Sequence, residues 1–173
     1  MLILAAMTKI GIISDTHGYL DEAVFKYFKD CDEIWHAGDF GNRELVERLQ
    51  AFKPLKGVYG NIDGHEIRAE FPEQLRWYCE GVEVLMIHIG GYPGRYAPSI
   101  KKYIQQNPPQ LFITGHSHIL KVMNDEQLKC LHINPGAAGN HGWHKVRTIV
   151  RLTIDGARMS NCEVIELGKR GSG

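Results

Sequence analysis

The sequence has little that is typical of membrane, thiol-redox or nucleic-acid-binding proteins. None of its hydrophobic runs is long enough to span a bilayer, so we expect no membrane partner. Its four cysteines are far apart and form no C-x-x-C pair, which argues against a zinc knuckle or a thiol redox pair. Lys+Arg and Asp+Glu both number 20, so the basic excess of an electrostatic nucleic-acid binder is missing. A metal-dependent nuclease stays open as an alternative, because bound cations supply positive charge locally.

Length and terminal segments predict one domain. The 173 residues are enough for a single hydrophobic core, which we expect over about residues 8–166 of a domain spanning 1–173. Residues 1–6 are apolar but carry no basic region, so we interpret them as an N-terminal extension and not as an export signal. We expect residues 169–173, Lys-Arg-Gly-Ser-Gly, to form a flexible tail. With no secretory signal evident, the cytoplasm is the expected location. Oligomeric state, including a homo-oligomer, stays open.

The first half of the chain alternates strands with helices. Strands are expected at 7–14, 33–37 and 55–59, and helices at 20–29 and from an Asn42 cap to about Gln50. Polar residues follow each strand. This pattern is typical of an α/β fold whose ligands lie at the carboxyl ends of parallel strands.

The second half is richer in strands. Hairpins are expected from 75–79 with 82–88, 119–123 with 127–133, and 146–154 with 158–166, besides a strand at 111–114 and a helix at 98–106. These hairpins predict a second, largely antiparallel layer.

Five short segments carry side chains of the kind that bind metal ions. They are Asp15-Thr16-His17, Gly38-Asp39, Gly60-Asn61, His88 and Gly115-His116-Ser117-His118. Together they offer two carboxylates, one carboxamide and four imidazoles. One divalent cation needs about four to six ligands, so seven donors indicate two cations with a shared ligand. Such a pair suits in-line displacement at phosphorus, which favours a hydrolase of phosphate esters.

Spacing within these segments supports convergence on one site. Asp15 and His17 are two residues apart, as are His116 and His118, so in an extended segment both members of each pair point to the same side. Asp39 is the best candidate for the shared ligand, because a carboxylate reaches two cations and this one stands alone in its segment.

The order D-x-H, G-D, G-N, H, G-H-x-H resembles that of the calcineurin-like metallophosphoesterases, over residues 10–136. The short length and Asn134-Pro-Gly resemble the compact bacterial and archaeal branch of that family, to which the retromer subunit of the same fold is related. The resemblance implies a four-layer α/β/β/α sandwich of two mixed sheets. It also implies that a hydroxide between two metals attacks phosphorus, with Mn²⁺ the commonest metal and Fe, Zn²⁺ or Ni²⁺ as alternatives.

The resemblance further implies an assignment of ligands. Asp15, His17 and His118 would hold one metal, Asp39 would bridge, and Asn61, His88 and His116 would complete the second site. Asp39, Asn61 and His88 are therefore also the expected catalytic residues.

One position departs from the family pattern. Many members have a histidine directly after Gly-Asn that protonates the leaving group, whereas this chain has Ile62. An alkyl side chain donates no proton, and general-acid help is typically worth about 10²–10⁴-fold in rate. Asp63 and His65 are close in sequence, but no pattern directs them to the site. We therefore expect a preference for esters with good leaving groups, such as aryl esters.

Four further residues are candidates for substrate contact or for support of the ligands. His36 and Asn134 are positioned in sequence to orient ligand loops, with a core histidine and an ordinary turn as the alternatives. Arg95 is a candidate phosphate clamp or a surface charge, and His141 a candidate at the mouth of the site or part of a solvated loop.

Two classes of function remain after these observations. The favoured one is a binuclear-metal phosphoesterase that acts on a small phosphate ester, more specifically a phosphodiester. The alternative is a metal-poor protein-interaction scaffold of the same fold. All seven expected donor residues are present, which favours the enzyme.

Overall fold

Two five-stranded sheets form the centre of the computed structural model, which describes residues 7–171. The first sheet has the order β12-β11-β1-β2-β3, and the second has the order β4-β5-β8-β10-β9. Strands of the first are β1 (Met7–Ile13), β2 (Glu33–His36), β3 (Leu55–Gly57), β11 (Val146–Asp155) and β12 (Arg158–Lys169). Strands of the second are β4 (Gln74–Cys79), β5 (Val82–Ile87), β8 (Leu111–Ile113), β9 (Lys121–Asp125) and β10 (Cys130–Asn134). A short hairpin of β6 (Gly91–Tyr92) and β7 (Arg95–Tyr96) forms a separate two-stranded sheet.

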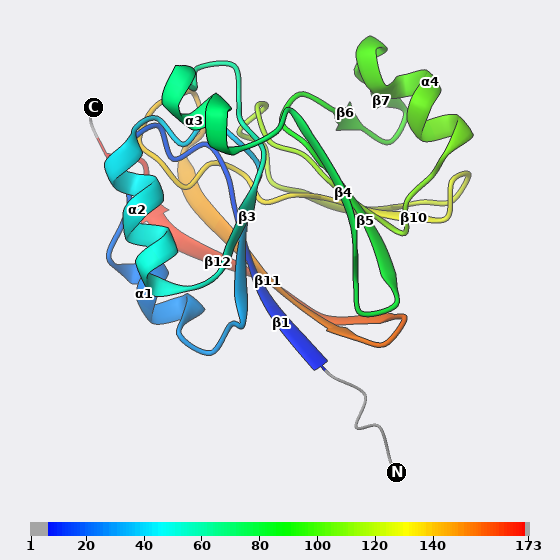
Figure 1. Cartoon of the computed structure of the whole chain (residues 1–173), viewed down its shortest axis with the longest axis horizontal. Coiled ribbons are helices and arrows are strands. Elements are labelled where there is room, and N and C mark those ends of the chain that lie inside the picture. Colours follow the sequence, from blue (N-terminus) through cyan, green and yellow to red (C-terminus); the bar gives the residue numbers. More distant parts are fainter. Residues whose placement is uncertain (1–6, 172–173) are drawn as a thin grey trace.

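Helices flank the two sheets on opposite sides (Figure 1). The helices are α1 (Ala23–Phe28), α2 (Arg43–Phe52), α3 (His65–Glu70) and α4 (Pro98–Gln106). Helices α1 and α2 lie beside the first sheet, and α4 lies at the far side of the second (Figure 1). This is the four-layer α/β/β/α arrangement of mixed sheets that the resemblance implied.

Three groups of buried side chains hold the layers together. Ile12, Trp35 and Met86 are fully buried between the two sheets. Phe28 fills the space between the first sheet and its helices, and Phe112 fills that between the second sheet and α4. Because both faces of each sheet are covered, the central strands are apolar on both faces, as β1 shows from Ile10 to Ile13.

Local sequence signals explain where the longer helices begin. Asn42 caps α2, its side-chain oxygen accepting a hydrogen bond of 2.9 Å from the Leu45 amide. Pro98 opens α4, where a missing N–H costs nothing. Both predictions are confirmed.

The prediction of a largely antiparallel second layer was wrong. β11 pairs antiparallel with β1, placing Leu152 opposite Ile10, so the last hairpin extends the first sheet. In the second sheet, β5, β8 and β10 run parallel. Local patterns reveal hairpins, but they do not reveal which distant strand an exposed edge will pair with.

Several shorter features were also missed or shifted. α3 and the β6–β7 hairpin were not predicted, and the turn between β9 and β10 comes later than expected. Asp125 explains the shift, because its Oδ1 accepts hydrogen bonds from the amides of Gln127 and Leu128 and so fixes the turn after β9.

The C-terminal segment is more ordered than expected. β12 continues to Lys169, and the Arg170 amide donates a hydrogen bond of 2.9 Å to the Lys145 carbonyl. The predicted flexible tail therefore began too early, at Lys169, although residues 172–173 lie outside the described residues. The N-terminal extension, residues 1–6, also lies outside them. Among residues 7–171, no helix combines the length and hydropathy needed to cross a membrane.

Candidate metal centre

The seven predicted ligands all follow the carboxyl ends of strands from both sheets. Asp15 and His17 follow β1, Asp39 follows β2, and Asn61 comes shortly after β3; His88 follows β5, and His116 and His118 follow β8. β1, β2 and β3 are parallel neighbours, as are β5 and β8, so their ends meet at one edge of each sheet. The structure thus brings the seven residues together.

Five of these seven residues have a left-handed backbone. The φ angles are 53° at Asp15, 46° at His17, 57° at Asp39, 69° at His116 and 59° at His118. This conformation is unfavourable for residues with a Cβ, at a cost of about 1–3 kcal/mol each, and persists where the surroundings enforce it. Here backbone hydrogen bonds between loops enforce it, including Asp15 N–H to the Gly38 carbonyl and His17 N–H to the Asp39 carbonyl, both 3.0 Å.

The ligand atoms fall into two groups. One donor atom each from Asp15, His17 and His118 lie within 4.8 Å of one another. The same is true of Asp39, His88 and His116. Asn61 joins the second group, because its Oδ1 lies 3.1 Å from His88 Nε2 and 2.9 Å from His116 Nδ1. Each group offers the spacing that a single cation needs.

Asp39 lies between the two groups. Its Oδ2 is 3.3 Å from His17 Nε2 and 3.2 Å from His88 Nε2. Its Oδ1 accepts a hydrogen bond of 3.0 Å from the Ile62 amide, which fixes the plane of the carboxylate. One carboxylate oxygen therefore faces donors of both groups, as a bridging ligand must.

Buried polar atoms at the centre lack protein partners. Asp15 is fully buried, and its Oδ1 has no hydrogen-bond partner among the described residues; the same is true of His17 Nε2. Asp15 Oδ2, in contrast, accepts hydrogen bonds from Ser14 Oγ and the His116 amide. Buried polar atoms are rarely left unsatisfied in proteins. A cation at this point would satisfy both orphaned atoms, so the residues present fit a metal.

The pKa shifts of Asp39 and His88 bear on how readily the centre would bind a cation. Burial by itself raises the pKa of Asp39, but the close contacts of its carboxylate with the rings of His17 and His88 outweigh it and hold the pKa well below its usual range. Burial lowers the pKa of His88, yet the hydrogen bond to Asp39 and the nearby Asp15 charge give a net increase. Asp39 is thus held in the charged form that binds a cation, and the raised pKa of His88 means that protonation of this ring competes with cation binding.

His36 supports the loops that carry the ligands of the first strands. It is fully buried, its Nδ1 accepts a hydrogen bond of 3.1 Å from the Gly38 amide, and its Nε2 lies 2.9 Å from Thr16 Oγ1. Burial lowers the pKa of His36 to about 3, so the ring is neutral. Thr16 Oγ1 in turn donates to the Phe40 carbonyl. His36 therefore joins the loop after β1 to the loop after β2 and belongs to neither group of ligand atoms.

Asn134 supports the loop after β8. Its Nδ2 donates to the Gly115 carbonyl at 2.9 Å and to Ser117 Oγ at 3.1 Å, while its Oδ1 accepts from the Gly136 amide at 3.0 Å. These contacts hold the segment that carries His116 and His118.

His141 lies at the mouth of the site. Its ring centroid is 4.8 Å from that of His17, and it lines an open cavity together with His17 and Trp143. Arg95 lies elsewhere. It is exposed on β7 and lines a cavity with Lys101 and Asp125 that contains none of the seven predicted ligands.

The position after Gly60-Asn61 carries no proton donor. The Ile62 side chain is 45% exposed and only its amide reaches Asp39. Asp63 is buried and engaged elsewhere, accepting hydrogen bonds from the Gly41 and Gly60 amides at 2.9 and 2.8 Å. Its carboxylate links two ligand loops, which leaves it unsuited to proton donation.

Arg68 was missed by the sequence interpretation. It lies on α3, and its guanidinium donates to the carbonyls of Asp63 at 2.6 Å and Asn61 at 3.2 Å. No sequence signal identified it, because α3 itself was not predicted.

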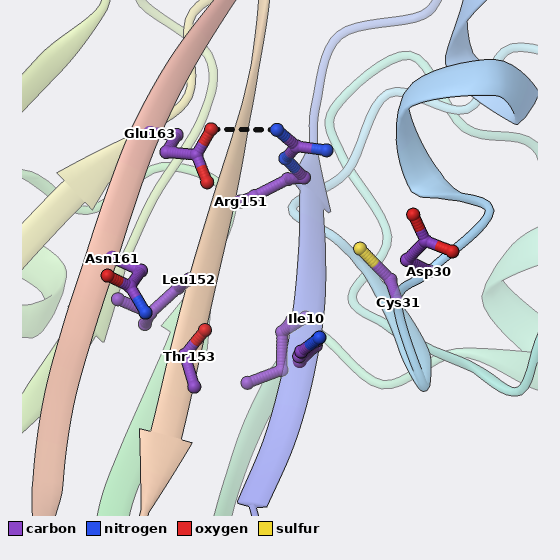
Figure 2. Close-up of a pocket in the computed structure, with 9 residues that line it drawn as sticks. Ile10, Asp30, Cys31, Arg151, Leu152, Thr153, Asn161 and Glu163 are labelled. Atoms are coloured by element: carbon purple, nitrogen blue, oxygen red, sulfur yellow. Dashed lines mark hydrogen bonds and ion pairs between the residues drawn. The ribbon is translucent and has the colours of Figure 1, made fainter.

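Another cavity lies away from this centre, against β1, β11 and β12 (Figure 2). Cys31, Asp30 and Thr153 line it, and an ion pair of 2.7 Å joins Arg151 and Glu163 at its side (Figure 2). It contains none of the seven predicted ligands, so it is separate from the candidate metal centre.

Comparisons with known proteins agree with this geometry. Residues 8–157 match the model of the calcineurin-like phosphoesterase superfamily domain. A protein of Methanothermobacter thermautotrophicus, described as a probable metallophosphoesterase, is 30% identical over 172 residues, covering 92% of each chain. A second such protein, from Methanocaldococcus jannaschii, is 28% identical over 141 residues, covering 78% of this chain and 70% of its own.

Solved structures show the same fold. An archaeal phosphodiesterase superimposes with a TM-score of 0.73 at 22% identity, covering 92% of this chain and 99% of its own. Vps29 of Entamoeba histolytica, solved with Zn²⁺, superimposes with a TM-score of 0.72 at 16% identity, covering 91% and 98%.

Proposed function

Because the chain belongs to the calcineurin-like phosphoesterase superfamily and is a metal-dependent phosphoesterase, we propose that it hydrolyses phosphodiesters at two divalent cations bridged by Asp39. The observation that carries this proposal is the position of Asp39 Oδ2, at 3.3 Å from His17 Nε2 and 3.2 Å from His88 Nε2. A single-cation site would not need a carboxylate oxygen shared between two histidine groups. The likeness to an archaeal phosphodiesterase supports the preference for diesters.

The proposal gives each residue a role. Asp15, His17 and His118 would hold the first cation, and Asn61, His88 and His116 the second. Two divalent cations, when bound, make a water molecule acidic enough to act as nucleophile near neutral pH and neutralise charge on the phosphate. The strained loops fix the donors in advance, so that little reorganisation is needed on binding.

The donor set also limits which metal is used. Nitrogen and oxygen donors without a thiolate suit Mn²⁺, Fe, Zn²⁺ and Ni²⁺. We propose Mn²⁺ as the working metal, a small phosphate ester as the substrate and the cytoplasm as the setting. The scaffold alternative is less favoured, because a chain without a metal has no need to bring seven donors together in strained loops.

Hydrolysis of two model esters tests the proposal. Purified protein, freed of metal and reloaded with Mn²⁺, should hydrolyse bis-p-nitrophenyl phosphate faster than p-nitrophenyl phosphate. Asp39→Asn should abolish both activities. Asp30→Asn, the same chemical change at an exposed residue away from the centre, should leave them unchanged. Equal or faster monoester hydrolysis would refute the diester preference, and no hydrolysis with any of the four metals would favour the scaffold.

A further inference from the structure

A mainly apolar cavity of about 220 Å³ lies directly beside the candidate metal centre. Gly115 and His116 form the wall next to the metal centre, and Ile89, Tyr92 and Ile119 contribute apolar surface. Ile89 and Ile119 are 42% and 61% exposed, so their apolar surface is open to a molecule in the cavity. The cavity therefore continues from the metal centre over an apolar surface.

A buried histidine without a partner also lines this cavity. His132 lies on β10 and is fully buried, yet neither of its ring nitrogens has a partner of good hydrogen-bond geometry among residues 7–171. Burial, followed by the charge of Lys121, lowers the pKa of His132 to about 4, and the backbone of Phe112 and the Asp125 carboxylate only partly oppose this. The neutral ring offers one N–H donor and one acceptor. His132 is thus a polar, unpartnered group in the wall of an otherwise mainly apolar cavity.

Lys121 adds a positive charge to the same cavity. Its Nζ lies 3.7 Å from the centroid of the Tyr92 ring, in a cation–π contact, and both side chains line the cavity. Within the described part of the chain, no carboxylate lies within ion-pair distance of Lys121. The cavity thus combines apolar walls with a cation and a hydrogen-bonding ring.

From this combination we propose that the cavity binds an organic group of the phosphate ester, and that this group is an aromatic ring carrying hydrogen-bond acceptors. The inference rests on the proposed function, because the ester's phosphate is taken to lie at the metal centre. The volume is below the roughly 300–1,000 Å³ of pockets that enclose drug-sized ligands, so it suits one ring system. An alkyl chain would offer no acceptor to the Lys121 ammonium group, and a polyol would be poorly matched to the apolar walls.

Binding of three phosphonates tests this proposal without requiring turnover. Methylphosphonate, phenylphosphonate and p-nitrophenylphosphonate share the group that binds the metals and differ only in what enters the cavity. Calorimetric titration of the Mn²⁺-loaded protein should show affinity rising about tenfold from methyl to phenyl, and about tenfold again for nitrophenyl. Equal affinity for all three would overturn the proposal.

Variants of residues that line the cavity test whether the added affinity of the nitrophenyl group arises there. Lys121→Met and His132→Phe should each remove the added affinity of the nitrophenyl group and leave methylphosphonate binding unchanged. Val122→Ala, at an exposed neighbour on β9 that does not line the cavity, should alter none of the affinities. Lys121→Met keeps the test decisive if the buried His132→Phe substitution prevents folding. Unchanged nitrophenyl binding in Lys121→Met would contradict the assignment.

Failure of this inference differs from failure of the proposed function. Hydrolysis of bis-p-nitrophenyl phosphate together with equal binding of the three phosphonates would refute only the cavity's role. Absence of hydrolysis together with graded phosphonate binding would refute only the proposed reaction. Absence of any phosphonate binding to metal-loaded protein would overturn the premise shared by both proposals, that a phosphoryl group binds at the metal centre, and the cavity's role with it.

Discussion

Asp39 Oδ2 lies 3.3 Å from His17 Nε2, although the two residues belong to loops that follow different strands. The same oxygen is 3.2 Å from His88 Nε2, which the second sheet supplies. A single carboxylate oxygen thus connects donors from both sheets. The two-cation account depends on this relationship, and the following predictions test the contacts around it.

Gly60 keeps the space that the Asp39 side chain needs. A Cβ at this position would overlap both Asp39 Oδ1 and the Asp39 amide nitrogen. Gly60→Ala should therefore displace Asp39 and lower kcat/KM for bis-p-nitrophenyl phosphate by about 100-fold, since small misplacements of this kind have effects of that order. Gly64→Ala is the matched control, because a Cβ there meets nothing within 4 Å. Equal activity of the two variants would mean that Asp39 is not held as described.

Asn134 should affect metal binding without touching the metal. Asn134→Ala removes the hydrogen bonds to Gly115 and Ser117. Residues that orient metal ligands typically contribute about 10–100-fold in affinity or activity, so Mn²⁺ affinity measured by calorimetry should fall by that factor. Asn134→Asp keeps the acceptor for Gly136 but loses both donated bonds, and it should be equally impaired. Asn124→Ala, at an exposed site on β9, should bind Mn²⁺ like the unmodified protein.

Ile62 should make the reaction sensitive to the leaving group. Neither Ile62 nor the engaged carboxylate of Asp63 offers a proton to a departing alkoxide. Aryl diesters should therefore be hydrolysed about 10²–10⁴-fold faster than alkyl diesters of the same size. Ile62→His should narrow this difference by accelerating the alkyl esters. Comparable rates for aryl and alkyl esters in the unmodified protein would reveal a proton donor from another segment.

His132 should make the protein less stable in mild acid. The pKa of His132 in the folded chain is about 4, below the ordinary histidine value of 6.5, so the unfolded chain binds the proton more readily. The contribution of neutral His132 to the free energy of unfolding is complete above pH 6.5 and is lost as the pH falls toward 4. The free energy of unfolding should therefore fall by about 2 kcal/mol between pH 7 and pH 5. Urea unfolding of metal-free protein at both pH values measures the change. His132→Phe should flatten this pH dependence by a similar amount; an unchanged slope would show that His132 does not titrate on unfolding.

Local sequence signals predicted much of the fold and most of the centre. Asn42, Pro98 and the apolar runs place helices and strands, and turns after parallel strands bring ligands to one edge. The order of the ligand segments then indicated the family. Such signals suffice where the relevant interaction lies within a few residues of the motif, or where the fold brings strand ends together as a rule.

Long-range contacts could not be predicted in the same way. The pairing of β11 with β1 joins segments from opposite ends of the chain. α3 is only six residues long, too short for a clear periodic pattern, so Arg68 was missed along with it. The role of Asp63, which links the loops at Gly41 and Gly60, depends on the folded arrangement of those loops and leaves no signature at the residue itself.

Calorimetric titration of metal-free protein with Mn²⁺ tests the shared role of Asp39 most directly. We predict two cations per chain in the unmodified protein. Asp39→Asn should weaken both binding events, whereas His118→Ala should weaken only one, because His118 belongs to the first group alone. A single bound cation, or an Asp39→Asn variant that loses only one of the two, would contradict the account.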